Sequence, residues 1–284
     1  MDWYLVLMIW GERYPEEDAN RIIRGAMARA RNCKGVVVLT DRTDRKIDEA
    51  ALQVPIDPEF NTPELKGGGL PVKLSMFTIE AIPKGATCIY LDLDTVVVGN
   101  LDRLAALTQR APIWTIPVFP RPFSAFYRLL WRATRRRVYA TGNSSAFVFV
   151  NGFEGNPKQQ FLELYRMGQL PKKLLNDDLF VGWSCQDCVR GLSINDLVNF
   201  RFEFLAPTLW MSDLFSVLRR RARQRIVAIT FAGPKTKPEL LESLADGEII
   251  KDHHGRRGRW DAFHTSGLKT LILQEIARGR GEQR

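Results

Sequence analysis

The sequence lacks any apolar run of about 18 residues, the length that a membrane-spanning helix needs. Its first segment, MDWYLVLMIWGERY, is apolar but short, and it has neither a basic leader nor a small-residue cleavage site. We therefore expect a first β-strand here and not a signal peptide. There is also no internal repeat and no low-complexity linker, so the 284 residues predict one large domain or two small ones.

Cysteine and histidine are scarce, with four cysteines and three histidines in the chain. Cys185-Gln-Asp-Cys188 has the spacing of half a zinc site or of a redox pair, but no second such motif accompanies it. His253-His254 is the other obvious ligand pair. We interpret Cys185 and Cys188 as reduced thiols in a loop, with a structural zinc ion as the alternative.

Acidic residues are absent from two segments that are rich in arginine. Residues 121–137 contain six arginines and residues 219–225 contain five, within a chain whose net charge is +9. Basic patches of this kind bind phosphates, which nucleic acid, anionic lipid or a phosphorylated substrate can supply. The sequence has no recognisable nucleic-acid-binding motif, so we expect no nucleic-acid partner.

The same two segments are rich in apolar residues. In RPFSAFYRLLWRATRRRVY (121–139), a helix would place Phe123, Phe126 and Trp131 on one side and arginines on another. LWMSDLFSVLRRRARQR (209–225) repeats this composition less cleanly. The pattern is typical of interfacial helices and predicts a cytoplasmic protein, peripheral to the inner face of an anionic membrane. The alternative is a helix packed on the sheet with its arginines in solvent.

Apolar strands and amphipathic helices alternate along the chain, which predicts an α/β fold with a parallel or mixed sheet covered by helices. Strands are expected at 3–9, 35–41, 86–92, 113–119, 145–150 and 226–231. Helices are expected at 16–31, 72–82, 157–168 and 267–278. Ligands of open α/β sheets bind beyond the carboxyl ends of the strands, where Asp41 and Asp92 stand.

Two carboxylates, Asp92 and Asp94, follow an apolar strand within YLDLDTVVVGNLD (90–102). At positions i and i+2 of an extended segment they project to one side and can converge on one divalent cation. Carboxylate oxygens suit magnesium or manganese, which keep positions for phosphate oxygens and water. Such an ion can bridge a diphosphate and neutralise a leaving group. The alternative is a solvated strand end in which Asp94 caps a turn.

The longer segment YLDLDTVVVGNLDRL (90–104) resembles the Asp-x-Asp segment of GT-A glycosyltransferases. The resemblance is to bacterial relatives of the glycogenin and lipopolysaccharide galactosyltransferase group, which is glycosyltransferase family 8. Further segments resemble this family in the expected order: WGERYPEEDANRI (10–22), VVVLTD (36–41), LPVKLSMF (70–77), GNSSAFVFVNG (142–152) and IVAITFAGPKTKPEL (226–240). The family implies a Rossmann-like GT-A fold, with a mixed, mostly parallel sheet flanked by helices.

The resemblance also implies a single GT-A domain whose parts have different functions. It would comprise a nucleotide-binding half at 1–105, a donor-sugar and acceptor half at 106–250, and a C-terminal basic tail and helix at 251–284. Asp92 and Asp94 would hold Mn²⁺ or Mg²⁺. The family's nucleotide-binding positions correspond here to Trp10, Gly11, Tyr14, Asp41, Lys73, Asp92, Lys235 and Lys237. Its donor-sugar positions correspond to Asn143, Ser144 and Ser145.

The family places a catalytic acidic residue in a later loop. LLNDDLFVGW offers Asp177 or Asp178, and the pair Gln186 and Asp187 is a second candidate. The sequence departs from the family at a late turn, which commonly reads Phe-His-Gly and supplies a third metal ligand but here reads Phe231-Ala232-Gly233. Either a later histidine, His253 or His254, replaces that ligand, or two carboxylates with phosphate and water suffice, or metal binding is impaired.

Together these features predict a metal-dependent hexosyltransferase. It would move a sugar from a nucleotide sugar, UDP-linked, to a glycan or lipid-linked acceptor in envelope polysaccharide synthesis. LDLDTVV also fits the Asp-x-Asp-x-Thr motif of haloacid-dehalogenase-like phosphatases, although that motif normally ends the first strand of its fold. The other alternative is a non-catalytic relative that binds nucleotide sugars.

Overall fold

The computed structural model describes residues 1–67, 71–118, 123–233, 236–260 and 267–279. The chain divides into two compact units, each assembled from three separate segments. Unit 1 consists of Met1–Tyr14, Asn32–Leu91 and Asp102–Leu192, and unit 2 of Pro15–Arg31, Asp92–Leu101 and Ser193–Arg284. The functional division expected from the sequence, with boundaries after residues 105 and 250, stays a prediction.

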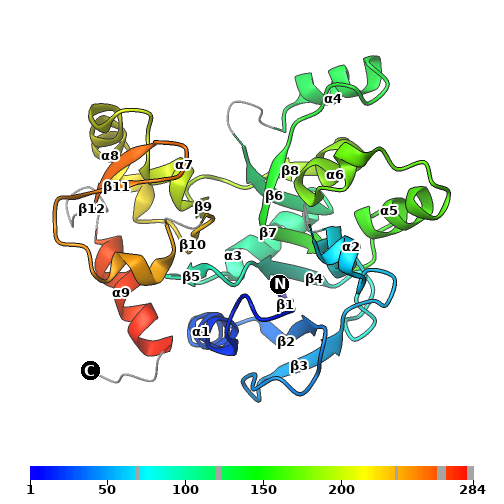
Figure 1. Ribbon diagram of the computed structural model, residues 1–284, viewed down its shortest axis with the longest axis horizontal. Helices are drawn as coiled ribbons and strands as arrows, with labels where there is room; N and C mark the ends of the chain where they lie inside the picture. Colours follow the sequence, from blue (N-terminus) through cyan, green and yellow to red (C-terminus); the bar gives the residue numbers. More distant parts are fainter. Residues whose placement is uncertain (68–70, 119–122, 234–235, 261–266, 280–284) are drawn as a thin grey trace. The chain divides into compact units, whose positions relative to one another are not determined.

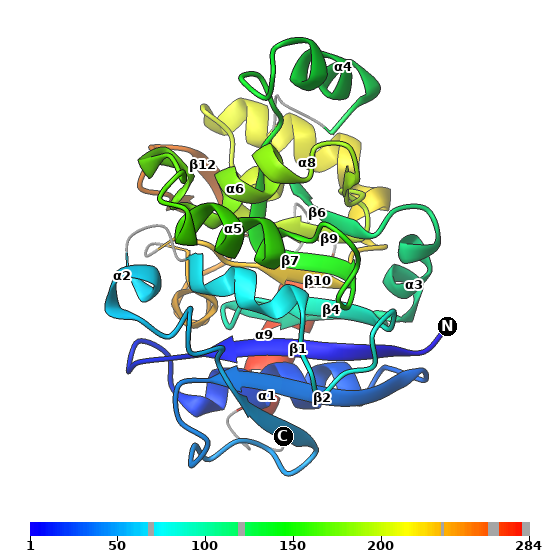
Figure 2. The same ribbon diagram turned by 90° about the vertical axis from the view of Figure 1, so that its right-hand side faces the viewer.

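Within the described residues, unit 1 is built on a seven-stranded sheet with the order β3-β2-β1-β4-β7-β6-β8 (Figure 1). Its strands are β1 (Trp3–Ile9), β2 (Cys33–Thr40), β3 (Ala51–Pro55), β4 (Thr87–Leu91), β6 (Ile113–Pro117), β7 (Gly142–Val150) and β8 (Val189–Gly191). Only β7 runs antiparallel to its described neighbours, β4 and β6. Figure 2 shows β7, β4, β1 and β2 side by side in this order. The predicted mixed, mostly parallel sheet is therefore confirmed.

Helices and short 3-10 segments flank this sheet. They are α2 (Pro63–Lys66), η1 (Pro71–Phe77), α3 (Asp102–Ala105), η2 (Ala106–Gln109), α4 (Ala125–Ala133), α5 (Pro157–Arg166), η3 (Lys172–Leu174) and α6 (Asp177–Ser184). The start of α6 is fixed by an N-cap, because the Asn176 side chain accepts a hydrogen bond from the Leu179 N–H. The cap places two aspartates in the first turn of this helix.

The helix expected at 72–82 is shorter and tighter than the sequence pattern indicates. It is the 3-10 segment η1, which ends at Phe77. The backbone that follows bonds to the Asn151 side chain, which accepts from the Ile79 N–H at 2.9 Å and donates to the carbonyls of Ile79 at 3.0 Å and Ile82 at 2.7 Å. This distant amide takes the backbone groups that a longer helix would have used, which local periodicity cannot predict.

Unit 2 contains a three-stranded sheet in its described part, in the order β5 (Thr95–Val97), β10 (Ala228–Thr230) and β9 (Leu197–Asn199). A hairpin of β11 (Glu248–Lys251) and β12 (Arg257–Trp260) accompanies it. The helical segments are α1 (Glu16–Met27), α7 (Phe200–Phe204), α8 (Leu209–Arg223), η4 (Pro238–Leu241) and α9 (Leu268–Gly279). Phe200 lies at the centre of its core, with ring centroids of Phe204 and Phe231 at 5.1 and 5.0 Å.

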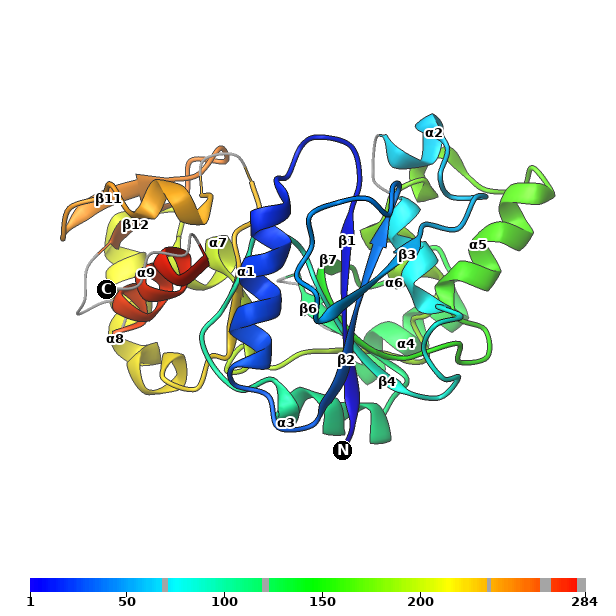
Figure 3. The ribbon, with the colours of Figure 1, turned by 90° about the horizontal axis from the view of Figure 1, so that it is seen from below.

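Helix α1 ends earlier than the predicted residue 31. After Met27 the chain turns, and the Arg29 side chain reaches α9, where Nη1 donates to Glu275 Oε2 at 3.0 Å. Figure 3 shows α1 beside α9, the pairing that this contact secures. Among the helices described in the two units, none is long and apolar enough to cross a bilayer.

Replacing Asn151 by leucine should lower the free energy of unfolding by about 3 kcal/mol, because three hydrogen bonds are lost and buried peptide groups stay unpaired. Urea denaturation followed by circular dichroism measures this change. The exposed Gln169 is the control site, and Gln169→Leu should change the value by less than about 0.5 kcal/mol. Equal stability of the two variants would contradict the assigned role of Asn151.

Candidate functional site

An acidic pair at the start of α6, of which Asp177 is buried and Asp178 half-buried, gathers several predicted site residues in unit 1. The Asp178 carboxylate accepts a hydrogen bond from the Ser144 N–H at the start of β7. Asp177 is only 4% exposed, and its Oδ1 accepts from the Asp178 N–H at 2.9 Å. Lys73 of η1 is also buried and acts electrostatically on Asp177. The structure therefore brings together four residues that the sequence singled out separately.

The two carboxyl groups of this pair differ in their environment. Burial, and then the charge of Asp178, raise the pKa of Asp177 to about 7, while the Lys73 ammonium lowers it. Asp177 Oδ2 is buried and has no hydrogen-bond partner among the described residues. A carboxylic acid beside a carboxylate can both donate and accept hydrogen bonds, which is what a polyhydroxyl ligand requires.

A glycine sets how closely α6 approaches the segment before β7. A Cβ atom at Gly182 would lie 2.3 Å from the Ala140 carbonyl oxygen, so no other residue fits without a backbone shift. The buried Gln186 reinforces this contact, because its Oε1 accepts from the Ala140 N–H at 2.7 Å. Asp187 forms an ion pair with Arg132 at 2.6 Å. The second predicted catalytic pair thus follows the C-terminal end of α6, whereas the first pair lies in the first turn of this helix.

The predicted nucleotide-binding residues at the ends of β1 and β2 form a second cluster in unit 1. Asp41 Oδ2 accepts from the Gly11 N–H at 2.9 Å, and Oδ1 accepts from Arg45 Nη2 at 2.9 Å. Burial alone would raise the pKa of Asp41, but the Gly11 N–H and the Arg45 guanidinium hold it below its ordinary value. Trp10 and Tyr14 are half-buried on either side of the Gly11 turn.

Arg45 was not predicted from the sequence. Its side chain is 1% exposed and also donates to the Gly11 carbonyl at 2.7 Å, so it ties the two strand ends together. The only sequence signal was the spacing of Asp41 and Arg45, four residues apart in a polar loop.

In unit 2, the acidic turn that follows β4 is embedded in a network of charges. Asp94 is 7% exposed, and its Oδ2 accepts from Lys237 Nζ at 2.6 Å. Between the two aspartates, the Leu93 carbonyl accepts from Arg21 Nη2 at 3.2 Å. The turn itself is closed by a hydrogen bond from the Thr95 N–H to the Asp92 carbonyl at 3.0 Å. The conformation of the turn is therefore held by side chains from distant parts of the sequence.

Arg21 is the member of this network that sequence reasoning missed. It lies in the middle of α1, where a solvated arginine would be ordinary, but it is 8% exposed. Its Nη1 lies 3.1 Å from both Asp18 and Glu239. Burial raises the pKa of Asp18 to about 6, against the opposing effect of Arg21. Arg21 thus connects α1 and η4 to the acidic turn.

The donor set at this turn fits a divalent cation that shares its coordination with a ligand. Asp92 and Asp94 supply hard oxygen ligands, and magnesium commonly uses one or two carboxylates together with phosphate oxygens and water. Throughout the described ranges, however, no group of three or more His, Cys, Asp or Glu side chains is placed to hold a metal. Lys237, on Asp94, would share that carboxylate with the cation.

The histidines expected to replace the missing ligand lie near the late turn. The His253 ring packs against Gly233, and its nearest atom lies 3.1 Å from the position that a Cβ atom would take there. The ring centroids of His253 and His254 are 4.1 Å apart. The His254 N–H donates to Asp252 Oδ1 at 2.9 Å. His254 as a metal ligand stays a prediction. Lys235 lies outside the described residues.

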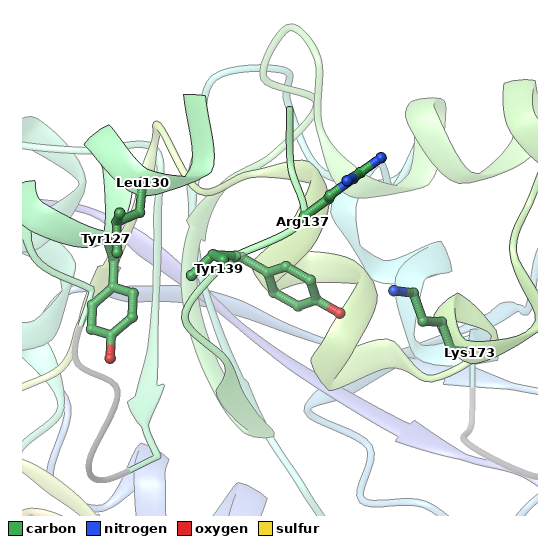
Figure 4. A pocket seen from close by; sticks show the side chains of 6 residues that line it. Tyr127, Leu130, Arg137, Tyr139 and Lys173 are labelled. Atoms are coloured by element: carbon green, nitrogen blue, oxygen red, sulfur yellow. The ribbon is translucent and has the colours of Figure 1, made fainter. Parts of the chain in front are cut away.

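A pocket of about 370 Å³ opens in unit 1 beside α4. Its lining is Tyr127, Leu130, Arg137, Val138, Tyr139 and Lys173. Figure 4 shows the Tyr139 hydroxyl and the Lys173 ammonium pointing toward each other across it. Aromatic faces combined with two cations suit a ligand that is both ring-shaped and anionic.

No family model matches the chain, and no curated protein matches it. Among solved structures, it is similar to the bifunctional glycosyltransferase WbbM, with a TM-score of 0.58 and 13% identity over 99% of this chain. The chain spans about half of WbbM, 52% of its length.

Two structures of the galactosyltransferase LgtC are also similar to this chain. An active-site mutant of LgtC gives a TM-score of 0.55 with 13% identity, over 98% of this chain and 99% of LgtC. A complex of LgtC with donor and acceptor sugar analogues gives 0.51 with 13% identity, over 99% and 100%. The chain therefore has the fold of these glycosyltransferases, which confirms the predicted GT-A architecture.

Gly182→Ala should lower the free energy of unfolding by about 1 to 3 kcal/mol, because the added methyl group meets the Ala140 carbonyl. Chemical denaturation measures this. Gly25→Ala in α1 is the matched control, since a Cβ there has ordinary contacts starting at 3.4 Å. The control should be neutral or stabilising by up to about 1 kcal/mol. A gain of stability at both positions would show that α6 does not approach so closely.

Asp18→Asn should change how stability depends on pH. The pKa of Asp18 is about 6 when folded, against 3.8 as its ordinary value, so the folded protein retains a proton that the unfolded chain has lost. The stability that the protonated Asp18 contributes is fully present below pH 4 and is lost as the pH rises through 6. The free energy of unfolding of the variant, relative to that of the wild type, should therefore rise by about 2 to 3 kcal/mol between pH 4 and pH 7. Urea denaturation at both pH values measures the gain, and a pH-independent difference would contradict it.

Proposed function

We propose that the protein is a nucleotide-sugar-dependent glycosyltransferase that moves a hexose from a UDP-linked donor to a glycan or lipid-linked acceptor. The observation that carries this proposal is the similarity of fold to glycosyltransferases over nearly the whole chain. Envelope polysaccharide synthesis is the process in which we place it. The LgtC complex with donor and acceptor sugar analogues supports a sugar donor and a sugar acceptor as the two ligands.

In the proposed reaction, each cluster has a separate task. Asp92 and Asp94 would hold Mn²⁺ or Mg²⁺, which when bound supplies positive charge to the diphosphate of the donor. Lys237 adds a second positive charge next to Asp94, suited to stabilising a departing diphosphate. Asp41 shapes the turn at Gly11 that would receive the nucleotide.

The acidic pair at α6 would bind the donor sugar. The Asp178 carboxylate accepts hydrogen bonds, and the protonated Asp177 can donate one, so together they orient sugar hydroxyl groups. Their partner Ser144 belongs to the predicted donor-sugar segment, which Asn143 and Ser145 complete. The pocket lined by Tyr139 and Lys173 suits an acceptor that carries a phosphate or another acidic group.

The proposal predicts that Mn²⁺ and UDP together raise the Tm of the protein and that UDP-hexose is slowly hydrolysed in the presence of Mn²⁺. Asp94→Asn should weaken the UDP- and Mn²⁺-dependent Tm shift and lower hydrolysis by about a hundredfold or more, because a carboxylate ligand is removed. Asp178→Asn should lower hydrolysis by a similar factor while leaving the UDP-dependent shift intact.

The control is Asp2→Asn, which neutralises an exposed aspartate before β1, at the opposite end of this strand from Gly11, and should leave both measurements unchanged. Hydrolysis of a generic aryl phosphate that Asp92→Asn abolishes would instead indicate the phosphatase alternative. Binding of UDP without turnover across a panel of nucleotide sugars would indicate a non-catalytic binding protein.

A further inference from the structure

Helix α8 of unit 2 buries a polar face against the unit and exposes a face that is largely apolar. Ser212, Ser216 and Arg223 are buried against the unit, at the spacing of one helical face. The opposite face is exposed and apolar: Trp210 (66%), Leu214 (48%), Phe215 (43%), Val217 (54%) and Leu218 (69%). A helix that packs on a globular core normally shows the reverse arrangement.

The inner face is fixed by specific hydrogen bonds. Ser212 Oγ donates to the Phe204 carbonyl at 2.8 Å, and Arg223 Nη1 donates to Ser216 Oγ at 2.8 Å. Arg223 Nε donates to Glu203 at 2.9 Å, and Arg219 Nε donates to the same carboxylate at 2.7 Å. Rotating α8 to bury its apolar residues would leave Glu203 buried without these partners, which is strongly unfavourable. The outward orientation is therefore built into the fold.

The outer face combines an apolar stripe with positive charge. Trp210, Leu214 and Leu218 follow one another at intervals of four residues and form a continuous line on the helix. Arg220, Arg221 and Arg225 are exposed at its C-terminal end. The one acidic residue of α8, Asp213, pairs with Arg259 of β12 at 3.2 Å. This apolar stripe, flanked by cations, is complementary to a surface whose outer layer is anionic and whose interior is apolar.

A bilayer rich in anionic phospholipid is such a surface. With 15 residues, α8 is about 22 Å long, too short to span a hydrocarbon core of about 30 Å. We propose that α8 is an interfacial helix that lies in the plane of an anionic membrane and holds unit 2 on it, with Trp210, Leu214 and Leu218 inserted among the acyl chains. This inference stands independently of the proposed enzymatic activity.

Helix α4 of unit 1, which the sequence also marked as interfacial, is less suited to this role. Trp131 is buried, and its Nε1 donates to the Trp183 carbonyl at 2.8 Å. Arg136 stacks on Trp131 at 4.9 Å, and Arg132 pairs with Asp187. The aromatic and basic side chains of α4 and of the segment that follows it are thus partly engaged within unit 1, although Phe126 and Leu129 remain exposed.

Vesicle flotation of the full-length protein tests the proposal. The wild type should float with vesicles of equimolar phosphatidylcholine and phosphatidylglycerol and bind phosphatidylcholine alone at least about tenfold more weakly. The triple variant Trp210→Ser, Leu214→Ser, Leu218→Ser should bind the anionic vesicles about a hundredfold more weakly. Arg220→Gln combined with Arg221→Gln should weaken binding to the anionic vesicles by about tenfold. Because all five side chains are exposed, the Tm of both variants should match that of the wild type.

A matched triple variant, Leu52→Ser, Met167→Ser, Leu240→Ser, removes apolar side chains of similar exposure from β3, the end of α5 and η4 and should leave binding unchanged. The same result is expected of Phe126→Ser combined with Leu129→Ser on α4. The proposal is overturned if the wild type does not bind anionic vesicles, or if the α8 triple variant binds them equally well. Loss of binding in the α4 variant would also overturn it. The proposal is likewise overturned if the protein does not bind vesicles and instead forms a dimer that the α8 triple variant abolishes. A second copy of the chain would then be what covers this face.

Discussion

The compensation of carboxylates that are partly or fully withdrawn from water, at the ends of β2 and β4 and at the start of α6, is the constraint on which the candidate sites of this protein depend. A carboxylate that leaves water loses several kcal/mol of hydration unless a cation, a hydrogen bond or a proton replaces it. Asp41 is compensated by the Gly11 N–H and the Arg45 guanidinium, and Asp94 by the Lys237 ammonium. Asp177 follows the third route, since burial favours its protonated form.

These three solutions leave the carboxyl groups with different chemical capacities. Asp41 is locked by its partners and is suited to shaping a loop. Asp94 accepts a hydrogen bond from the flexible Lys237 ammonium, and a divalent cation would share that carboxylate with it. Asp177 keeps a proton near neutral pH and can act as a hydrogen-bond donor. The proposed roles in nucleotide, metal and sugar binding follow from these differences and not from the residue type, which is the same in all three.

The sequence predicted the parts of the structure that depend on local composition. The apolar runs at 3–9 and 86–92 became β1 and β4, whereas the roles assigned to the acidic pairs at 92–94 and 177–178 stay predictions. Hydrogen bonds between residues far apart in the sequence could not be predicted in this way. Arg21, Arg45 and Asn151 read as ordinary polar residues, and only the fold reveals that Arg21 and Asn151 bond to backbone groups roughly 70 residues away.

Helix α8 shows why the orientation of a helix is harder to predict than its existence. Its sequence has an apolar stripe, and the usual inference from such a stripe is a buried face. The deciding interaction is the buried Glu203, which requires Arg219 and Arg223 on the inner side and so turns Trp210 and Leu218 outward. The electrostatic rule that organises the carboxylates of the candidate sites thus also determines which surface of unit 2 is left apolar. An interaction worth a few kcal/mol inside the protein can in this way create a binding surface outside it.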